Sequence, residues 1–378
     1  MKKLAGVTAL ALLAMLLAAG ACLLLFVERR PDRPFPQTFA PQTAAGRNAA
    51  TLLAGLHHIY SMPSLSAAVA VNGQLVWSGA VGYADLSTRR PADAGTRYRI
   101  GSVSKSITAV AVMRLAEMGV VDLDAPYATY VPDFPSASAG YSLKQLLSHQ
   151  AGIRHYRGWG EMASNTPYDG PREAATLFAG DPLLFPPGTG FSYSSHGYTA
   201  VALAMENAAG QPYAEIVRQL VLEPAGMDST RLDRKGDPAA ATRYMLFAGL
   251  LFEALADDLS DRQAGGGFVS TPGDLVRLGI ALTSGNLLAP ESRTRMWTPV
   301  PLSDGTMNPQ RYALGFREGA DDLGRFLHHG GTANGGSAML LIYPDLGLTV
   351  ALCTNYDGQE SGFDRLKAAQ GLAALFKP

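Results

Sequence analysis

The segment Ser102-Val103-Ser104-Lys105 places a hydroxyl and an amine three positions apart, where Gly101 gives way to a long apolar stretch. Because an α-helix has about 3.6 residues per turn, we expect Ser102 and Lys105 to point into the same space. Ser102 would also lie at the helix N-terminus, where the macrodipole favours an alkoxide or an oxyanion. The pattern predicts a serine nucleophile beside an amine. The alternative is an N-cap serine followed by a solvent-facing lysine.

A second candidate element is Tyr193-Ser194-Ser195, in a segment rich in Gly and Pro just ahead of a predicted helix. Free tyrosine has a pKa of about 10, so it acts as a base at neutral pH only where a cation stabilises the phenolate. Lys105 is the cation that we expect beside Tyr193. The alternative for Tyr193 is a half-buried loop aromatic. His149 and His155 are expected only to satisfy hydrogen bonds in loops.

A third candidate element is His328-His329-Gly330-Gly331, which leads through further glycines into a predicted strand. Glycine has no Cβ, so a substrate backbone can approach such a strand and pair with it. We expect the backbone N–H groups of Gly331 and Ser102 to form an oxyanion hole, worth ~3 kcal/mol per donor. The alternatives are a loop or bulge, surface histidines, or a zinc site. Adjacent strand positions point to opposite faces, which argues against zinc binding by His328 and His329.

Secondary-structure patterns predict how these elements are held. Strands are expected over 64–82 (two, joined at Asn72-Gly73), 337–343 and 348–354, and helices over 51–60, 102–119, 142–150, 198–209 and 363–376. Strands near both ends thus enclose a middle that is rich in helices. The pattern predicts an α+β fold, with one antiparallel sheet flanked by the terminal helices and a mostly helical subdomain.

Composition excludes several classes of protein. The 378 residues carry a formal net charge of -1, with 31 Lys and Arg against 32 Asp and Glu, and no long basic run. Nucleic acid is therefore not an expected partner. Two cysteines cannot organise a disulfide framework. The chain has no P-loop, no His-Glu-x-x-His and no Gly-x-Ser-x-Gly motif, so nucleotide, zinc-protease and α/β-hydrolase chemistry are not predicted.

The N-terminus suggests a membrane anchor. Residues 4–27 carry no charged side chain, and as a helix they would cover a hydrocarbon core of roughly 30 Å. We therefore predict an anchor or uncleaved signal over 1–27, a Pro-rich tether over 28–50 and a catalytic domain over 51–378. Lipidation of Cys22 is a minor alternative. Basic residues on both sides of the span leave its orientation open.

The three elements in this order resemble the motifs of the penicillin-recognising serine hydrolase superfamily, Ser102-x-x-Lys105, Tyr193-x-Ser195 and His328-x-Gly330. Within this superfamily the chain is most similar to the class C β-lactamase-like branch and its mitochondrial serine β-lactamase-like members. The similarity extends through residues 146–156 and 264–271. It implies a fold of the β-lactamase and penicillin-binding-protein type.

The resemblance also implies a mechanism. Ser102 would form an acyl-enzyme, Lys105 and Tyr193 would share the role of general base, and Tyr193 would return the proton to the leaving group. The backbone and side chains of Ser195, His328, Gly330 and Gly331 would bind a small-molecule or peptide substrate. No metal or organic cofactor is required. The superfamily further suggests a catalytic domain on the periplasmic side of the cell membrane, and oligomerisation is a further expectation.

Two departures from the superfamily bear on the substrate. His328 stands where dedicated β-lactamases often have Lys, and Ser195 stands where they have Asn. A mostly neutral histidine would anchor a carboxylate weakly at pH 7. We therefore expect a peptidase or esterase. The alternatives are a β-lactamase or D-Ala carboxypeptidase, a slowly deacylating sensor, and a self-assembling scaffold.

Overall fold

Turn chemistry builds the first hairpin of the central sheet. β2 (Ser64–Val71) and β3 (Gln74–Asp85) are joined by Asn72 and Gly73. These two residues have φ values of 50° and 79°, as a type I′ hairpin turn requires. The computed structural model describes residues 35–378 apart from 41, 137–139, 248–249 and 358–361.

The central sheet is antiparallel and has the order β1-β3-β2-β13-β12-β11-β10, with β4 paired to β3. Its centre joins β2, from the beginning of the domain, to β13, from the end. Its other strands are β1 (Gln37–Ala40), β4 (Arg90–Pro91), β10 (Arg317–Asp321), β11 (Gly324–Ala333), β12 (Gly336–Tyr343) and β13 (Leu348–Thr354). Two small sheets contain β5 (Tyr98–Arg99), β9 (Phe268–Ser270) and β6 (Arg231–Leu232), and β7 (Tyr244–Phe247) and β8 (Leu250–Glu253).

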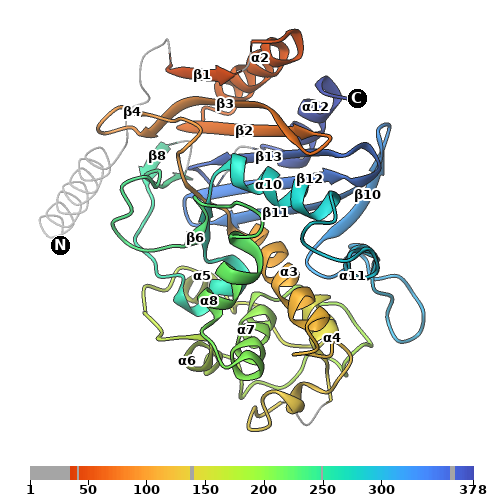
Figure 1. The fold of residues 1–378 in the computed structure, drawn as a ribbon. Coiled ribbons are helices and arrows are strands. Elements are labelled where there is room, and N and C mark those ends of the chain that lie inside the picture. Colours follow the sequence, from red (N-terminus) through yellow and green to blue (C-terminus); the bar gives the residue numbers. More distant parts are fainter. Residues whose placement is uncertain (1–34, 41, 137–139, 248–249, 358–361) are drawn as a thin grey trace, which may run out of the picture.

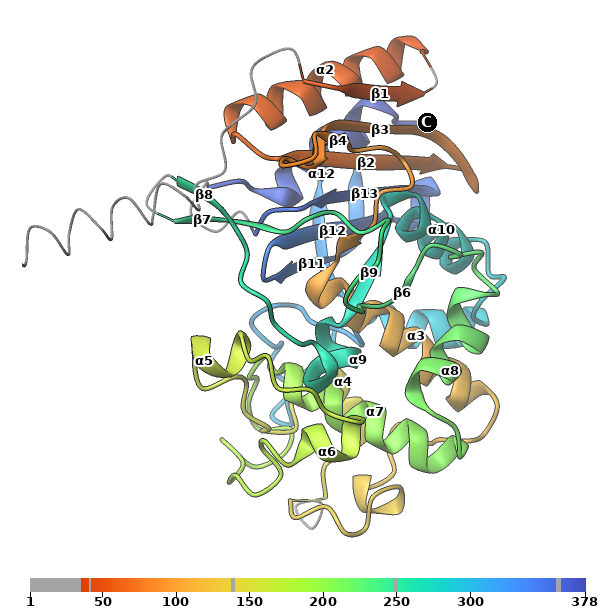
Figure 2. The ribbon, with the colours of Figure 1, turned by 90° about the vertical axis from the view of Figure 1, so that its left-hand side faces the viewer.

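Helices lie on both faces of the sheet (Figures 1 and 2). Three of them frame it, α2 (Ala44–Ile59), α12 (Arg365–Leu375) and α10 (Pro272–Thr283). α2 and α12 cover one face, whereas α10 packs against β2 and β13 from the other. The contact between α10 and β13 is so close that a Cβ on Gly279 would lie 2.4 Å from Cγ2 of Thr349.

A mostly helical region lies beside the face that carries α10 (Figure 2). Its helices are α3 (Ser104–Glu117), α4 (Leu143–Leu147), α5 (Trp159–Met162), α6 (Pro171–Ala175), α7 (Ser195–Ala209), α8 (Tyr213–Val217) and α9 (Gln263–Gly266), with α11 (Pro290–Trp297) nearer the sheet. One hydrophobic core joins this region to the sheet, and a second core lies under α2 and α12. The predicted α+β fold is confirmed.

The domain begins earlier than the sequence pattern indicates. β1 pairs with β3 from Gln37 opposite Val81 to Ala40 opposite Ser78, and α2 begins at Ala44. Residues 37–40 and 44–50 therefore belong to the domain and not to the tether predicted for 28–50. Prolines favour extended backbone, which an edge strand accommodates as readily as a tether does.

The predicted location at the cell membrane is corrected. Among the residues that the structure describes, no helix is long and apolar enough to cross a bilayer. The predicted span over 4–27 and Cys22 lie outside the described residues.

Candidate active site

Ser102 lies in a single 3₁₀ turn, Gly101–Val103, that leads directly into α3. Gly101 has φ 48°, and a Cβ at this position would lie 2.6 Å from the carbonyl oxygen of Thr332. The turn therefore needs glycine, both for its conformation and for its approach to β11. Lys105 Nζ lies 3.2 Å from Ser102 Oγ, as the spacing of the motif predicts. Ser102 does not act as an N-cap.

Lys105 is completely buried, and its amine contacts three oxygens. Besides Ser102 Oγ, Nζ lies 2.9 Å from Ser195 Oγ and 2.5 Å from the carbonyl oxygen of Gly265. Burial lowers the pKa of Lys105 well below its usual value, and the positive charges of Arg317 and Arg262 lower it further. A neutral amine fits these contacts, because it donates to two of the oxygens and accepts from the Ser102 hydroxyl.

Tyr193 completes the cluster, because Lys105 Nζ lies 4.8 Å from the centre of its ring and its hydroxyl hydrogen-bonds to Ser102. Burial raises the pKa of Tyr193 to about 12, although the hydrogen bond to Ser102 and the charge of Arg317 act in the opposite direction. Ser195 begins α7, with Ser194 as the N-cap. The three remote segments thus meet as predicted.

The structure places His329, and not His328, on the side of the sheet that faces Ser102. His328 pairs with Leu341, which belongs to the core under α2 and α12, and its ring contacts Phe326 at 5.6 Å. His329 is fully buried beside Tyr193, with ring centres 6.3 Å apart. His328 therefore does not reach the site, and its neighbour takes the place that we predicted for it.

His329 is held in one tautomer. Its Nδ1 lies 2.7 Å from the carbonyl oxygen of Gly330 and must carry the proton, so Nε2 accepts. Nε2 lies 2.8 Å from the Tyr312 hydroxyl and 3.4 Å from a terminal nitrogen of Arg317. Burial lowers the pKa of His329 well below its usual value, and the positive charge of Arg317 adds to this effect. His329 is therefore a neutral group that orients Arg317.

The backbone of β11 presents a free edge to the site. β10 ends its pairing at Arg317 opposite His328, so residues 329–333 pair only with β12 among the described strands. Both hairpins of β11 close through two-residue loops, so even-numbered residues turn their N–H groups toward the β10 side and odd-numbered residues toward β12. The N–H groups of Gly330 and Thr332 therefore face the site, and the N–H of Gly331 does not.

Gly331 allows a close approach between β11 and the turn of Ser102, whereas we predicted its N–H as an oxyanion-hole donor. A Cβ at this position would lie 1.8 Å from the carbonyl oxygen of Ile100 and 2.8 Å from the backbone nitrogen of Ser102. Only glycine allows β11 to approach the turn that carries the nucleophile so closely. The second backbone donor beside Ser102 is consequently assigned to Thr332, whose side chain is held by Arg365.

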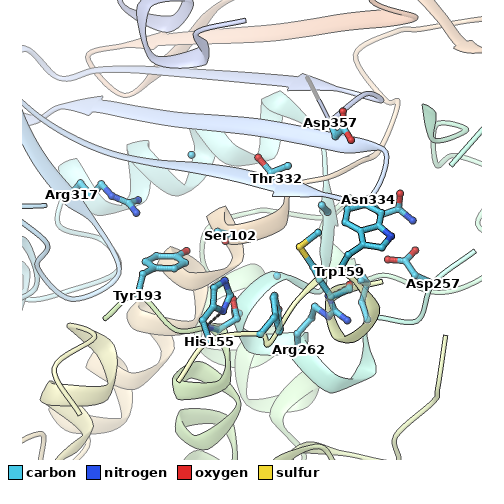
Figure 3. A pocket seen from close by; sticks show the side chains of 18 residues that line it. Ser102, His155, Trp159, Tyr193, Asp257, Arg262, Arg317, Thr332, Asn334 and Asp357 are labelled. Carbon is cyan, nitrogen blue, oxygen red and sulfur yellow. Dashed lines mark hydrogen bonds between the residues drawn. The ribbon is translucent and has the colours of Figure 1, made fainter. Parts of the chain in front are cut away.

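A pocket of about 290 Å³ opens over Ser102 (Figure 3). Its walls combine the free edge of β11 with side chains of the helical region and of residues 257–266. The lining residues include Ser102, Tyr193, Ser195, His155, Tyr156, Trp159, Met162, Arg262, Arg317, Gly330 and Thr332. His155, Arg262 and Arg317 are residues that motif analysis missed.

Comparison with known proteins agrees with this geometry. The sequence profile of the Beta-lactamase family matches residues 49–375, so the chain belongs to this family. It is therefore a serine hydrolase related to β-lactamases and penicillin-binding proteins, whose family acts on amide and ester bonds.

Individual relatives cover most of the chain. The serine β-lactamase-like protein LACTB, mitochondrial, of Homo sapiens is 28% identical over 83% of this chain and 74% of its own. Penicillin-binding protein 4* of Bacillus subtilis is 27% identical over 80% of this chain and 70% of its own. The octameric penicillin-binding protein homologue from Pyrococcus abyssi superposes with a TM-score of 0.73 at 23% identity, covering 87% of this chain and 76% of its own, which supports the fold.

Proposed function

We propose that this chain cleaves an amide or ester bond of a peptide-like substrate through an acyl-enzyme on Ser102. The observation that carries the proposal is the 3.2 Å contact between Ser102 Oγ and the buried Lys105 amine. Because burial holds the pKa of Lys105 down, the amine can accept the serine proton while Oγ attacks the carbonyl carbon. The family membership supports the same chemistry.

Tyr193 then donates its proton to the leaving group, and the proton that Lys105 took from Ser102 passes to the Tyr193 phenolate, which restores both groups. Water then hydrolyses the ester and frees Ser102. A phenol with a pKa raised to about 12 stays protonated at neutral pH, and its hydrogen bond to Ser102 keeps it beside the reacting bond. The N–H groups of Ser102 and Thr332 would stabilise the tetrahedral oxyanion. We therefore assign the role of general base in acylation to Lys105 alone, although the sequence led us to expect that Lys105 and Tyr193 share it.

Arg317 favours a substrate with a carboxylate. Its Nε donates to Gln310 at 2.9 Å, and its guanidinium lies 5.3 Å from the centre of the Tyr193 ring. No carboxylate in the part of the chain that the structure describes forms an ion pair with Arg317. Asp257 and Asp357 also line the pocket, but neither forms an ion pair with Arg317. A permanent cation that no described carboxylate pairs with would attract an anionic group, such as the C-terminus of a peptide. Arg317 of β10 thus supplies the positive charge that the neutral His329 lacks.

The test is hydrolysis of short peptides ending in D-Ala or an L-residue, acyl esters and a chromogenic cephalosporin by wild type and Ser102→Ala. We expect turnover of peptides or esters that the variant loses, and equal rates would refute the role of Ser102. For Arg317, each peptide is compared with its C-terminal amide. The preference for the free acid should fall in Arg317→Gln, and an unchanged preference would remove the carboxylate from the proposal.

Mass spectrometry of the intact protein separates the enzyme from the sensor. A transient adduct on Ser102 is expected of an enzyme and a persistent one of a sensor. Oligomerisation remains a prediction, since the octameric state belongs to the Pyrococcus abyssi neighbour. Native mass spectrometry of the purified chain measures it directly.

A further inference from the structure

His155 occupies the wall of the pocket that faces β11. In Figure 3, Thr332 of β11 and His155 lie on opposite sides of Ser102. The imidazole ring is fixed by its neighbours, with its centre 4.2 Å from that of Tyr156 and 5.7 Å from that of Tyr193. It comes from the loop after α4, far in sequence from the three motifs.

The hydrogen bonding of His155 determines which nitrogen carries the proton. Its Nδ1 accepts from the backbone N–H of Ser195 at 3.2 Å. In a neutral imidazole the other nitrogen then carries the hydrogen, so Nε2 is a donor. Burial lowers the pKa of His155 to about 4, so the ring is neutral near pH 7. Because His155 lines the pocket, this N–H donor can be reached by a ligand.

An extended substrate would meet both walls at once. A chain that adds to the free edge of β11 uses the polar groups along one of its edges, namely those facing Gly330 and Thr332. Its backbone carries further N–H and C=O groups along the opposite edge, as every strand does. That opposite edge would be turned toward the helical region, where His155 stands.

We propose that His155 donates a hydrogen bond from Nε2 to a main-chain carbonyl oxygen of the substrate, on the substrate edge that is turned away from β11. His155 is thus a specificity-determining residue that selects substrates with an amide carbonyl near the scissile bond. The inference rests on the proposed acyl-enzyme function. It concerns recognition of the substrate and leaves the identity of the nucleophile untouched.

Two variants separate this role from support of Ser195. An asparagine side chain can replace Nδ1 as the partner of the Ser195 N–H but does not extend as far as Nε2. A glutamine side chain places its amide N–H near the position of Nε2. If His155 binds the substrate, His155→Gln retains the selectivity and His155→Asn loses it. His58→Gln, on α2 and outside the pocket, is the matched control.

The assay uses two esters of equal chain length that differ in one amide group, p-nitrophenyl N-acetylglycinate and p-nitrophenyl pentanoate. The measured quantity is the ratio of their kcat/KM values, which cancels changes that affect both esters alike. One neutral hydrogen bond corresponds to about a fivefold change, so we expect the ratio to fall about fivefold in His155→Asn and to recover in His155→Gln. The proposal would be overturned if the ratio were unchanged in His155→Asn, or if the preference for the acetylglycinate ester disappeared only in His155→Gln.

A second measurement keeps the two proposals apart. Acetamidomethylboronic acid and butylboronic acid are matched in the same way and bind a serine nucleophile without turnover. Calorimetry should show the same fivefold loss of preference for the acetamido compound in His155→Asn, and equal preference in wild type and variant refutes the role of His155. If the esters show no turnover that depends on Ser102, the proposed hydrolysis fails, whereas the boronate ratio still decides the role of His155.

Discussion

Replacing Lys105 by methionine should separate the catalytic use of this residue from its cost to stability. Methionine fills similar space but accepts no proton. Positioned general bases contribute typically 10²- to 10⁴-fold, so we expect kcat/KM for p-nitrophenyl acetate to fall by that factor, or about 3 to 5 kcal/mol of transition-state stabilisation. The Ser102 hydroxyl remains in place but loses the amine that lies 3.2 Å away.

The same variant should change how stability depends on pH. The pKa of Lys105 is lowered in the folded protein, so between this pKa and the unfolded value the unfolded chain binds more protons. Wild-type stability should therefore rise with pH across this window, by about 1.4 kcal/mol for each pH unit. Lys105→Met lacks this rise. Loss of the donor to Ser195 and Gly265 adds a cost of about 1 to 3 kcal/mol that does not vary with pH.

Urea unfolding of both proteins from pH 7 to 10, followed by circular dichroism, gives the two stability curves. We expect the wild-type free energy of unfolding to increase relative to that of the variant as the pH rises. Lys144→Met is the control, because Lys144 is 40% exposed and pairs with Asp124 at the surface. Parallel curves for wild type and Lys105→Met, together with undiminished hydrolysis, would refute a buried neutral amine acting as base.

Two glycine pairs test the close approaches that build the site. Gly331→Ala should abolish ester hydrolysis or folding, because its Cβ would collide with the turn that carries the nucleophile. Gly330→Ala should lose far less activity, because its Cβ would lie 3.2 Å from the end of the Met339 side chain. Equal losses of activity in the two variants would contradict the assigned geometry. Gly279→Ala should lower the melting temperature, at a cost of about 1 to 3 kcal/mol, because α10 must move off β13. Gly273→Ala lies on the same helix, and its Cβ would be 3.6 Å from the nearest atom, so it should leave the melting temperature unchanged. Similar melting temperatures for the two variants would refute the close packing of α10 on β13.

The sequence predicts the parts of this site that depend on local periodicity. Ser102 and Lys105 meet because helical spacing alone brings them together, and the Asn72-Gly73 turn forms because both residues tolerate positive φ. The segment around Tyr193 reaches them only through the fold. Its role follows from the order of the three motifs and not from any local rule.

Register is what the sequence leaves undecided. The pattern His-x-Gly fits both His328-x-Gly330 and His329-x-Gly331, and a shift of one residue exchanges the two faces of a strand. Only the pairing of β11 with β12 shows that His329 faces the nucleophile. The same alternation moves the backbone donor from Gly331 to Thr332.

Two further residues enter the pocket through contacts that no local pattern reveals. Arg317 reaches His329 from the neighbouring strand, and His155 reaches Ser195 from a loop of the helical region. For His155 we predicted only a hydrogen bond within a loop, whereas its ring accepts from the N–H of Ser195 at the start of α7. Its exposure to the pocket depends on packing between segments far apart in sequence, which a single chain does not display.

Covalent labelling tests the central claim most directly. Wild type, Ser102→Ala and Lys105→Met are treated with a fluorophosphonate, and the site of the adduct is mapped by peptide mass spectrometry. The account predicts one adduct, on Ser102, that is absent from Ser102→Ala and forms about 10²- to 10⁴-fold more slowly in Lys105→Met. An adduct on another residue, or labelling of Ser102 at the wild-type rate without Lys105, would contradict it.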